Sequence, residues 1–458
     1  MTTVPSYLKN KSNLSKNFFI STYGCQMNVN DSERMACLLE MAGWNPSPTV
    51  EMSDLILINS CSIREKPVHK VRSEIGRYKQ LKQKKPYLKI GVAGCVAQQE
   101  RSKLLKQIPL LDFVLGTDAI DELPQVLLQL EHGKKIASIK QEPKKPYHVQ
   151  TLIGKPGIST FVNISKGCDN FCSFCVVPFT RGRERSRPLS QLIKDINSLV
   201  QRGVKEVTLL GQNVNSYRSP CGADFAKLLE NLAIKTDIQR IRFTTSHPKD
   251  FNEELVETMQ KYRSKIMDFI HLPVQSGNTN ILKKMNRGYS REEYIEKANM
   301  ILKKMPGSVL STDLIVGFPG ETEEAFEDSL SLLDEVPYES IFSFKYSARP
   351  FTKARSFNNQ VPEQIKSQRL SKLQKKHEKI AFLLAKKYEK AFLEVLVEKK
   401  DKKTGLFMGR STQNKLVYFK GKNTDIGKIM PIRIDKVNIC TFYGEKYDKN
   451  YKKEKEMD

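Results

Sequence analysis

The feature that most constrains the fold is a repeated alternation of short apolar runs with amphipathic stretches along most of the chain. Within residues 17–130 the apolar runs are Phe18–Ile20, Leu55–Asn59, Leu88–Ala93 and Phe113–Leu115. The stretches that follow them, 31–42, 64–81, 98–107 and 118–130, have the period of an amphipathic helix. Four strand–helix units in succession predict a parallel sheet in an α/β fold.

A second alternating series follows a segment rich in Lys and Pro, 139–157, which is typical of a linker. The predicted strands are Thr160–Ser165, Glu206–Leu210, Ile241–Thr245, Phe269–Val274, Val309–Val316 and Ile341–Tyr346. A helical pattern follows each strand except the last. Six units favour a partial (βα)6 barrel over a flat dinucleotide-binding sheet, although periodicity alone does not separate the two. In either fold, the site is expected in the loops after the strand ends.

The last part of the chain changes character. Residues 362–390 have the pattern of a long charged amphipathic helix. Short apolar runs with Gly turns follow, which is typical of a small β-barrel; they are Phe392–Val397, Leu406–Gly409, Leu416–Phe419, Ile432–Ile434 and Asn438–Phe442. We therefore expect three domains, 16–135, 154–384 and 385–448.

The chain has 458 residues and a formal net charge of +25, which makes a polyanion such as nucleic acid the first candidate partner. Residues 361–458 hold 25 Lys and Arg against 13 Asp and Glu, a surplus of 12. No apolar run approaches the about 20 residues of a membrane helix, and no secretory signal is evident. Nine unevenly spaced cysteines argue against a disulfide framework. We expect a cytoplasmic protein with reduced thiols and no membrane partner.

Three cysteines follow the first strand of the second series: Cys168, Cys172 and Cys175, spaced C-x3-C-x2-C. A structural zinc site uses four protein ligands, and after Cys175 neither Cys nor His occurs until Cys221. A [4Fe–4S] cluster is held by thiolates on its irons, so three thiolates leave one iron open for chemistry. The motif favours an open iron–sulfur cluster, with zinc as the alternative.

Cys25, Cys61 and Cys95 form a second set, 36 and 34 residues apart. Each lies just past the end of a predicted strand. Because the carboxyl ends of parallel strands share one edge of the sheet, the three thiols are expected to converge there. The alternative is that they are ordinary buried cysteines, and we expect Cys37 and Cys221 to be either such residues or surface thiols without a role.

Together, the two cysteine sets resemble the methylthiotransferase family of radical S-adenosylmethionine (SAM) enzymes, over most of the chain. The first set lies in Gly24-Cys-Gln-Met-Asn28, which is similar to the opening motif of the branch that acts on N6-isopentenyladenosine in tRNA. Residues 392–442 resemble the TRAM domain, an RNA-binding β-barrel. The barrel motifs that resemble the family are Gly211-Gln-Asn-Val-Asn215, Ser246-His-Pro248, His271-Leu-Pro-Val-Gln-Ser-Gly277, Met285-Asn-Arg-Gly288 and Thr312-Asp-Leu-Ile-Val-Gly-Phe-Pro-Gly-Glu321.

The resemblance implies a transferase with two [4Fe–4S] clusters. The ligands would be Cys168, Cys172 and Cys175 for the SAM-cleaving cluster, and Cys25, Cys61 and Cys95 for an auxiliary cluster. One SAM would methylate a sulfur at the auxiliary cluster, and a second would supply the radical that removes hydrogen from C2 of N6-isopentenyladenosine next to the anticodon. The implied partners are a tRNA anticodon stem–loop and an electron donor of the flavodoxin or ferredoxin type, and we expect a monomer.

Other polar groups at the predicted strand ends carry weaker signals. Gln212 and Asn213 are predicted to hydrogen-bond SAM, with a capped turn as the alternative. Gly317, Gly320 and Glu321 either approach the adenosyl group or form a turn. The lone His247 and His271 are more typical of satisfied polar residues than of catalysts. The run Arg181-Gly-Arg-Glu-Arg-Ser-Arg187 is predicted to hold phosphates, against an alternative of solvated charge.

Two other functions within the family remain open at this point: methylthiolation of threonylcarbamoyl-adenosine in tRNA, or of an aspartate in a ribosomal protein. Gln26 and Met27 favour the isopentenyladenosine branch, because the related branches resemble Gly-Cys-Lys-Val-Asn or Gly-Cys-Pro-Lys-Asn there. A different class is a non-catalytic, metal-stabilised RNA-binding protein. One departure from the family is Phe351, in Tyr346-Ser-Ala-Arg-Pro-Phe-Thr352, where Gly is usual.

Overall fold

The structure is a computed structural model, and it describes residues 16–62, 65–141, 147 and 149–447. Its first unit is a six-stranded parallel sheet of order β2-β1-β3-β4-β5-β6. The strands are β1 (Asn17–Tyr23), β2 (Asn45–Pro46), β3 (Leu55–Ser60), β4 (Lys89–Ala93), β5 (Phe113–Leu115) and β6 (Ile136–Ser138). The parallel α/β prediction is confirmed, with two short edge strands, β2 and β6, added to the four predicted.

Helices cover both faces of this sheet and enclose two separate apolar cores. One face carries α1 (Gln26–Met41) and α6 (Leu123–Leu130), which follows the short 3-10 helix η2 (Ile120–Glu122). The other carries α2 (Glu65–Arg77), α3 (Lys79–Lys84), α4 (Cys95–Glu100) and α5 (Lys103–Gln107). Parallel sheets are commonly buried in this way, which explains why β3 is buried at every position.

Three predicted helix bounds in this domain were wrong. The helix predicted at 31–42 begins at Gln26, directly after Cys25. The helix predicted at 64–81 is divided at Tyr78, and residue 64 lies outside the described residues. The helix predicted at 98–107 is divided near Arg101, whose positive φ of 54° interrupts a right-handed helix.

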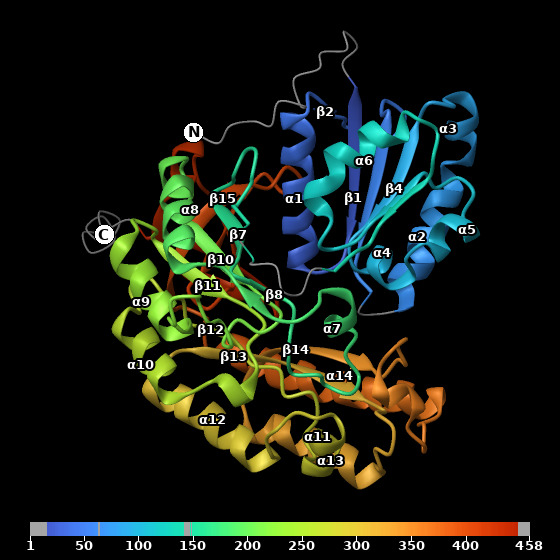
Figure 1. Ribbon diagram of the computed structural model, residues 1–458. Helices are drawn as coiled ribbons and strands as arrows, with labels where there is room; N and C mark the ends of the chain where they lie inside the picture. The colour runs from blue at the N-terminus through green and yellow to red at the C-terminus, as the bar shows by residue number, and fades with distance from the viewer. Residues whose placement is uncertain (1–15, 63–64, 142–146, 148, 448–458) are drawn as a thin grey trace.

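The central unit is a partial barrel of six parallel strands in chain order, as predicted. Sheet β11-β10-β7 and sheet β12-β13-β14 are joined where Ile241 pairs with Ile266. The strands are β7 (Ser159–Asn163), β10 (Glu206–Leu210), β11 (Arg240–Phe243), β12 (Phe269–His271), β13 (Val309–Val316) and β14 (Tyr338–Lys345). The main covering helices are α8 (Leu189–Gln201), α9 (Phe225–Lys235), α10 (Glu253–Lys261), α12 (Arg291–Lys304) and α13 (Glu323–Glu335). Figure 1 shows them outside the strands.

The C-terminal unit is the predicted small β-barrel, closed in the order β15-β16-β17-β19-β18. Helix α14 (Glu363–Lys386) packs against β14 of the large barrel and leads into the small barrel. The strands are β15 (Phe392–Lys400), β16 (Phe407–Ser411), β17 (Leu416–Phe419), β18 (Ile429–Val437) and β19 (Thr441–Lys446). The domain bounds 16–135, 154–384 and 385–448 stay predictions, and residue 448 lies outside the described residues.

Buried arginines join the small barrel to the large one. Arg240, the first residue of β11, donates to the carbonyl oxygens of Arg410 and Glu394 at 2.8 and 2.9 Å. Arg242 donates to the Ser411 carbonyl at 2.6 Å and pairs with Glu206 at 2.8 Å. These contacts lie near the amino ends of β10 and β11. The small barrel therefore packs at the end of the large barrel opposite its strand carboxyl ends.

The N-terminal unit lies beside the large barrel, where α1 contacts β7 and α4 contacts the short helix α7 (Val177–Thr180) (Figure 1). Asn30 of α1 donates to the Phe161 carbonyl of β7 at 3.1 Å. Helix α4 begins at Cys95, and α7 begins two residues after Cys175. The docking thus brings a loop from each cysteine set to the same interface. Among the described helices, none has the length and apolar composition needed to cross a bilayer.

Candidate functional site

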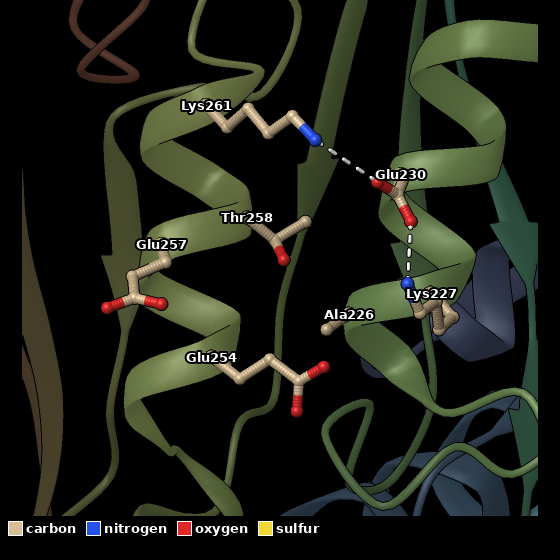
Figure 2. Close-up of a pocket in the computed structure, with 7 residues that line it drawn as sticks. All are labelled: Ala226, Lys227, Glu230, Glu254, Glu257, Thr258 and Lys261. Atoms are coloured by element: carbon tan, nitrogen blue, oxygen red, sulfur yellow. Dashed lines mark hydrogen bonds and ion pairs between the residues drawn. The ribbon is translucent and has the colours of Figure 1, made fainter.

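Of the two described hollows, one lies outside the barrel between α9 and α10, with a volume of about 200 Å³. Figure 2 shows Glu230 between Lys227 and Lys261, which it pairs with at 3.0 and 3.5 Å. The hollow lies between two helices on the outside of the barrel, and its charges are partly paired. It has neither a thiol nor an unpartnered buried donor, and we do not assign it to the site.

The cysteine loop lies directly after β8 (Ser165–Lys166), at the carboxyl end of the first barrel strand. Cys168 N donates to the Gly182 carbonyl at 3.2 Å, and Cys175 N donates to the Cys172 carbonyl at 2.9 Å. Gly167 has a φ of 82°, and a Cβ there would lie 2.0 Å from the Arg183 carbonyl oxygen. The tight turn therefore requires glycine at this position. We refer to Cys168, Cys172 and Cys175 as the loop triad.

Burial and a neighbouring arginine set the charge environment of the loop triad. Burial raises the pKa of the Cys168 thiol to about 11 and that of Cys175 to about 12, because a thiolate is poorly solvated there. Arg287, 5% exposed, donates through Nη1 to Cys172 Sγ at 3.3 Å and through Nη2 to the Pro273 carbonyl at 2.8 Å. Arg287 thereby places a positive charge within hydrogen-bonding distance of a sulfur of the loop triad. Arg287 lies in the quoted motif at 285–288, but its role was not predicted.

Cys25, Cys61 and Cys95, the sheet triad, converge at the carboxyl edge of the N-terminal sheet. Cys61 hydrogen-bonds both Cys25 and Cys95. Two tight turns hold this edge: a Cβ on Gly94 would lie 2.3 Å from Asn59 Oδ1, and one on Gly24 would lie 2.6 Å from Cys61 Cβ. The predicted convergence of the three thiols is therefore present in the structure.

The sheet triad has a different charge environment. The hydrogen bond from Cys61 is the main cause that lowers the pKa of Cys25 to about 6 and that of Cys95 to about 6, with Arg181 adding to it. The pKa of Cys61 is raised correspondingly, because it retains the shared proton. The environment of the sheet triad thus favours the thiolate form at Cys25 and Cys95 over that at Cys61.

Both triads fit a four-iron cluster by their donor chemistry. Within the described part of the chain, no three His, Cys, Asp or Glu side chains are placed to bind one mononuclear ion. In a four-iron cluster each thiolate binds a different iron, and three thiolates leave one iron for a further ligand. All six cysteines are free of disulfides. The ligand roles predicted for them are therefore chemically compatible with the structure.

A buried ion pair ties the sheet triad to the barrel. Arg181 Nη2 lies 2.8 Å from Asp31 Oδ2, with side chains 4% and 8% exposed. Beside it, Asp118 of the N-terminal unit pairs with Lys166 at 2.5 Å and with Arg185 at 2.8 Å. These contacts cross the interface between the two units. They fix the edge carrying the sheet triad against the loop that follows Cys175.

The ion pairs line a hollow of about 140 Å³ between the two units. The phosphate-binding role predicted for the arginine run is therefore restricted. Arg181 and Arg187 are buried in ion pairs, the latter with Asp195 at 2.5 Å, and Arg185 is partly buried. Arg183 also forms an ion pair, with Asp169 at 2.8 Å, but its side chain is 59% exposed, and it is the member of the run that faces solvent.

The two residues predicted to contact SAM have protein partners in this structure. Gln212 accepts from the Gly167 backbone and donates to the sulfur of Met27, so it links the loop triad to the segment after Cys25. Asn213 donates to Asp250 at 2.6 Å and accepts from His247 N at 3.1 Å. Their predicted contact with SAM stays a prediction.

Three other polar side chains at the strand ends have buried atoms without a hydrogen-bond partner among the described residues. Asn215 leaves both amide atoms unpartnered, Ser246 its Oγ and His247 its Nε2, and all three residues are buried. Burial lowers the pKa of His247 to about 2, so the imidazole is neutral. A buried polar group normally has a partner. The ammonium, carboxylate and ribose hydroxyls of SAM are partners of the required kind, and the site fits this cofactor.

The remaining candidates are structural in this arrangement. Glu321 accepts from Gly317 N at 2.7 Å and pairs with Arg369 of α14 at 2.8 Å, which favours the turn interpretation of residues 317–321. His271 hydrogen-bonds Ser311 at 2.9 Å. Cys37 is half-buried and Cys221 is exposed, and both lie outside the two triads.

Comparison with known proteins agrees with the three-unit architecture. Residues 162–333 match the Radical SAM superfamily, residues 386–445 match the TRAM domain, and residues 17–116 match the uncharacterized protein family UPF0004. Among solved structures, the chain is similar to the radical SAM methyltransferase TsrM from Kitasatospora setae, with a TM-score of 0.53 at 13% identity, covering 75% of this chain and 77% of that one. It is also similar to the cobalamin-dependent radical SAM enzyme OxsB, with a TM-score of 0.52 at 12% identity, covering 81% and 56%. At these identities the likeness shows the fold alone.

The barrel, its cysteine loop and the superfamily match define a radical SAM enzyme, which binds SAM and an iron–sulfur cluster. Two relatives are named tRNA-2-methylthio-N6-dimethylallyladenosine synthase. The one from Bdellovibrio bacteriovorus is 55% identical over 94% of this chain and 96% of that protein. The one from Carboxydothermus hydrogenoformans is 44% identical over 94% and 99%. The chain belongs to the family of tRNA-2-methylthio-N6-dimethylallyladenosine synthases.

Proposed function

We propose that this protein methylthiolates C2 of N6-isopentenyladenosine, the nucleoside that its relatives' names call N6-dimethylallyladenosine, next to the anticodon of tRNA. The product is 2-methylthio-N6-isopentenyladenosine. The main support is the near-full-length similarity to synthases of that name. The docking of the N-terminal unit also supports it, because a group transferred between two cofactor sites requires both at one interface.

The proposal assigns two [4Fe–4S] clusters, one to Cys168, Cys172 and Cys175 and one to Cys25, Cys61 and Cys95. When bound, the first supplies the electron that cleaves SAM and the second supplies the site where sulfur is methylated. The lowered pKa of Cys25 and Cys95 supports the second assignment, since thiolate is the metal-binding form.

The chain's own groups bind and orient the reactants. Asn215, Ser246 and His247 offer neutral hydrogen-bonding atoms to the polar groups of SAM. Gln212 and Asn213 hydrogen-bond the neighbouring strand-end loops, through Gly167 and Asp250 respectively. We propose that their side-chain amides also contact SAM. The Asp31–Arg181 pair holds the sheet edge that carries the sheet triad in a fixed relation to the cysteine loop.

The TRAM barrel and the surplus positive charge of residues 361–458 support binding of the tRNA anticodon stem–loop. In such a loop the target base can leave its stack and enter a buried site. Reductive cleavage consumes an electron, so the proposal includes a flavodoxin- or ferredoxin-type donor. A monomeric state, a cytoplasmic location and the three domain bounds given above are part of the same proposal.

The test uses protein reconstituted with iron and sulfide in the absence of oxygen, then supplied with SAM, a reductant and an isopentenylated anticodon stem–loop. Mass spectrometry of the nucleosides is expected to show the methylthio product, and chemical analysis about eight irons per chain, because two four-iron clusters are assigned. An unmodified stem–loop under conditions that cleave SAM would contradict the substrate. Bound zinc without SAM cleavage would indicate the non-catalytic RNA-binding protein instead.

A further inference from the structure

Three phenylalanines beside the loop triad are exposed to solvent. Phe171 is 40% exposed, Phe179 40% and Phe351 56%. Phe171 lies between Cys168 and Cys172, and Phe179 lies in α7, four residues after Cys175. A single exposed apolar side chain is ordinary, but several at the mouth of a buried site indicate an interaction surface.

Phe351 reaches this place through a strained turn. Its φ of 70° is in the left-handed region, which a bulky side chain rarely adopts. The turn follows β14 and is attached to the cysteine loop, because Ala354 N donates to the Ser173 carbonyl at 2.8 Å. The ring is exposed, so burial in the core does not offset this strain. Strain of this kind concentrates at functional sites.

The rings of Phe179 and Phe351 form a tilted pair, with centroids 5.7 Å apart and planes at 34°. Because both side chains remain largely exposed, the pair retains apolar surface for a third ring. Basic groups accompany the rings: Lys353 and Arg355 are exposed in the same segment, and the Arg183 guanidinium lies 4.9 Å from the Phe171 ring centroid. Aromatic faces combined with cations are the pattern that binds unpaired nucleotides.

The proposed reaction creates a need for such a surface. A target base that leaves its stack deprives the neighbouring bases of a stacking partner, which opposes its extrusion. An aromatic ring on the cysteine loop can replace that partner. The exposed cations beside this ring complement the negative charge of the RNA backbone.

We propose that Phe179 and Phe351 form a stacking surface for unpaired bases of the anticodon loop that flank the target adenosine, with Phe171 and Arg183 extending the contact. This inference rests on the proposed function and specifies its RNA contact. Stacking requires an aromatic ring at this position, so the Phe351→Tyr variant should keep the affinity for RNA.

The test measures the Kd of the cluster-loaded full chain, with SAM, for an isopentenylated anticodon stem–loop by fluorescence anisotropy at fixed salt. Phe351→Gly removes the ring and suits the positive φ, so the variant should fold. It is expected to bind about fivefold or more weakly, and Phe351→Tyr about as well as wild type. Tyr87→Ala is the matched control, since Tyr87 is 61% exposed and lies just before β4, at the sheet edge opposite Cys95.

A second measurement separates stacking from a general loss of affinity. Stem–loops with an abasic nucleotide on either side of the target base are compared in wild type and Phe351→Gly. At the stacked position, the abasic change should weaken wild type but add little to the variant. Equal affinity of wild type and Phe351→Gly would overturn the inference and leave the proposed function standing. If wild type neither bound nor modified the stem–loop, both would be overturned.

Discussion

The loop triad and the sheet triad each offer three cysteine sulfurs as ligands, but the two triads are assembled in different ways. The loop triad comes from a single loop after β8, so local backbone hydrogen bonds set its geometry. The sheet triad comes from three strand ends, 36 and 34 residues apart, and depends on the whole parallel sheet. The comparison teaches that one chain can prepare similar donor sets through local spacing or through topology.

The two triads also differ in their charge balance. Arg287 donates hydrogen bonds to Pro273, Tyr289 and Cys172, and none of these described partners is a carboxylate. Arg181, beside the sheet triad, is paired with Asp31. The loop triad is therefore exposed to a largely uncompensated cation, while the charge near the sheet triad is balanced.

The largest expected effect separates the two triads by function. Cys168→Ala should abolish SAM cleavage, because a ligand of the SAM-cleaving cluster is removed. Cys25→Ala should retain reductive cleavage and lose the methylthio product, because it disturbs only the sheet triad. The measurement is mass spectrometry of 5′-deoxyadenosine and of the tRNA nucleosides in the same reaction.

Cys37→Ala is the matched control for this pair, since Cys37 is a half-buried cysteine of α1 outside both triads. It should retain both products. Loss of cleavage in Cys25→Ala together with intact cleavage in Cys168→Ala would reverse the assignment of the two triads.

The next effect concerns stability at the interface that carries the sheet triad. Arg181→Leu leaves the Asp31 carboxylate buried without its cation and should lower the free energy of unfolding by about 3–5 kcal/mol. Chemical denaturation measures this. Arg181→Leu combined with Asp31→Leu should recover much of the loss, because the uncompensated charge is gone.

The control is Lys376→Gln, which removes one partner of the exposed Lys376–Asp334 pair and should cost less than about 1 kcal/mol. A loss for Arg181→Leu as small as that for the control would mean that the buried pair contributes little to the docking of the two units.

The same contrast between local and distant contacts explains which secondary-structure elements could be predicted from the sequence and which were missed. The bounds of β10 and β13 were predicted correctly, because each is a compact run bounded by turn residues. The edge strands β2 and β6 were missed, since Asn45–Pro46 and Ile136–Ser138 are too short to show a period. The start of α1 was placed late because residues 26–30 are mostly polar and form no apolar stripe.

In the site, the loop spacing and the strand ends identified six cysteines, and the structure brings the sheet triad together. The Arg181–Asp31 pair joins residues 150 positions apart and has no local signal. Arg287 lies in a recognisable motif, yet nothing in its sequence context names Cys172 as its partner. Long-range pairing of this kind is decided by the fold, which periodicity describes only in outline.

A moderate effect should follow from the uncompensated cation at the loop triad. Arg287→Gln removes a positive charge beside Cys172, so adding an electron to a cluster held there becomes less favourable and its reduction potential should fall. Cleavage activity should fall by about 10–100-fold. Redox titration followed by electron paramagnetic resonance measures the potential.

Arg287→Lys retains the charge and should keep the potential closer to that of wild type. The Arg181→Leu/Asp31→Leu variant removes a balanced pair and should leave the potential of this cluster unchanged. A potential that is the same in Arg287→Gln and in wild type would show that Arg287 only positions the loop.

The smallest effect appears in the protein before cluster insertion. With a pKa of about 6, Cys25 is about nine-tenths thiolate at pH 7, whereas Cys168, with a pKa of about 11, is almost wholly protonated. Iodoacetamide reacts with thiolate, so alkylation of Cys25 should rise through pH 6 and that of Cys168 only above pH 9. Both side chains are partly exposed, so access alone does not favour either. Exposed Cys221 calibrates the reagent in each digest, and peptide mass spectrometry follows all three residues.

Variants of Cys61 test the cause of this difference, because Cys61 supplies the hydrogen bond that lowers the pKa of Cys25. Cys61→Ala removes the donor and should shift the alkylation profile of Cys25 to higher pH. Cys61→Ser keeps a donor and should shift that profile less. Matching profiles for Cys25 and Cys168 in wild type would show that the two triads do not differ in charge before iron binds.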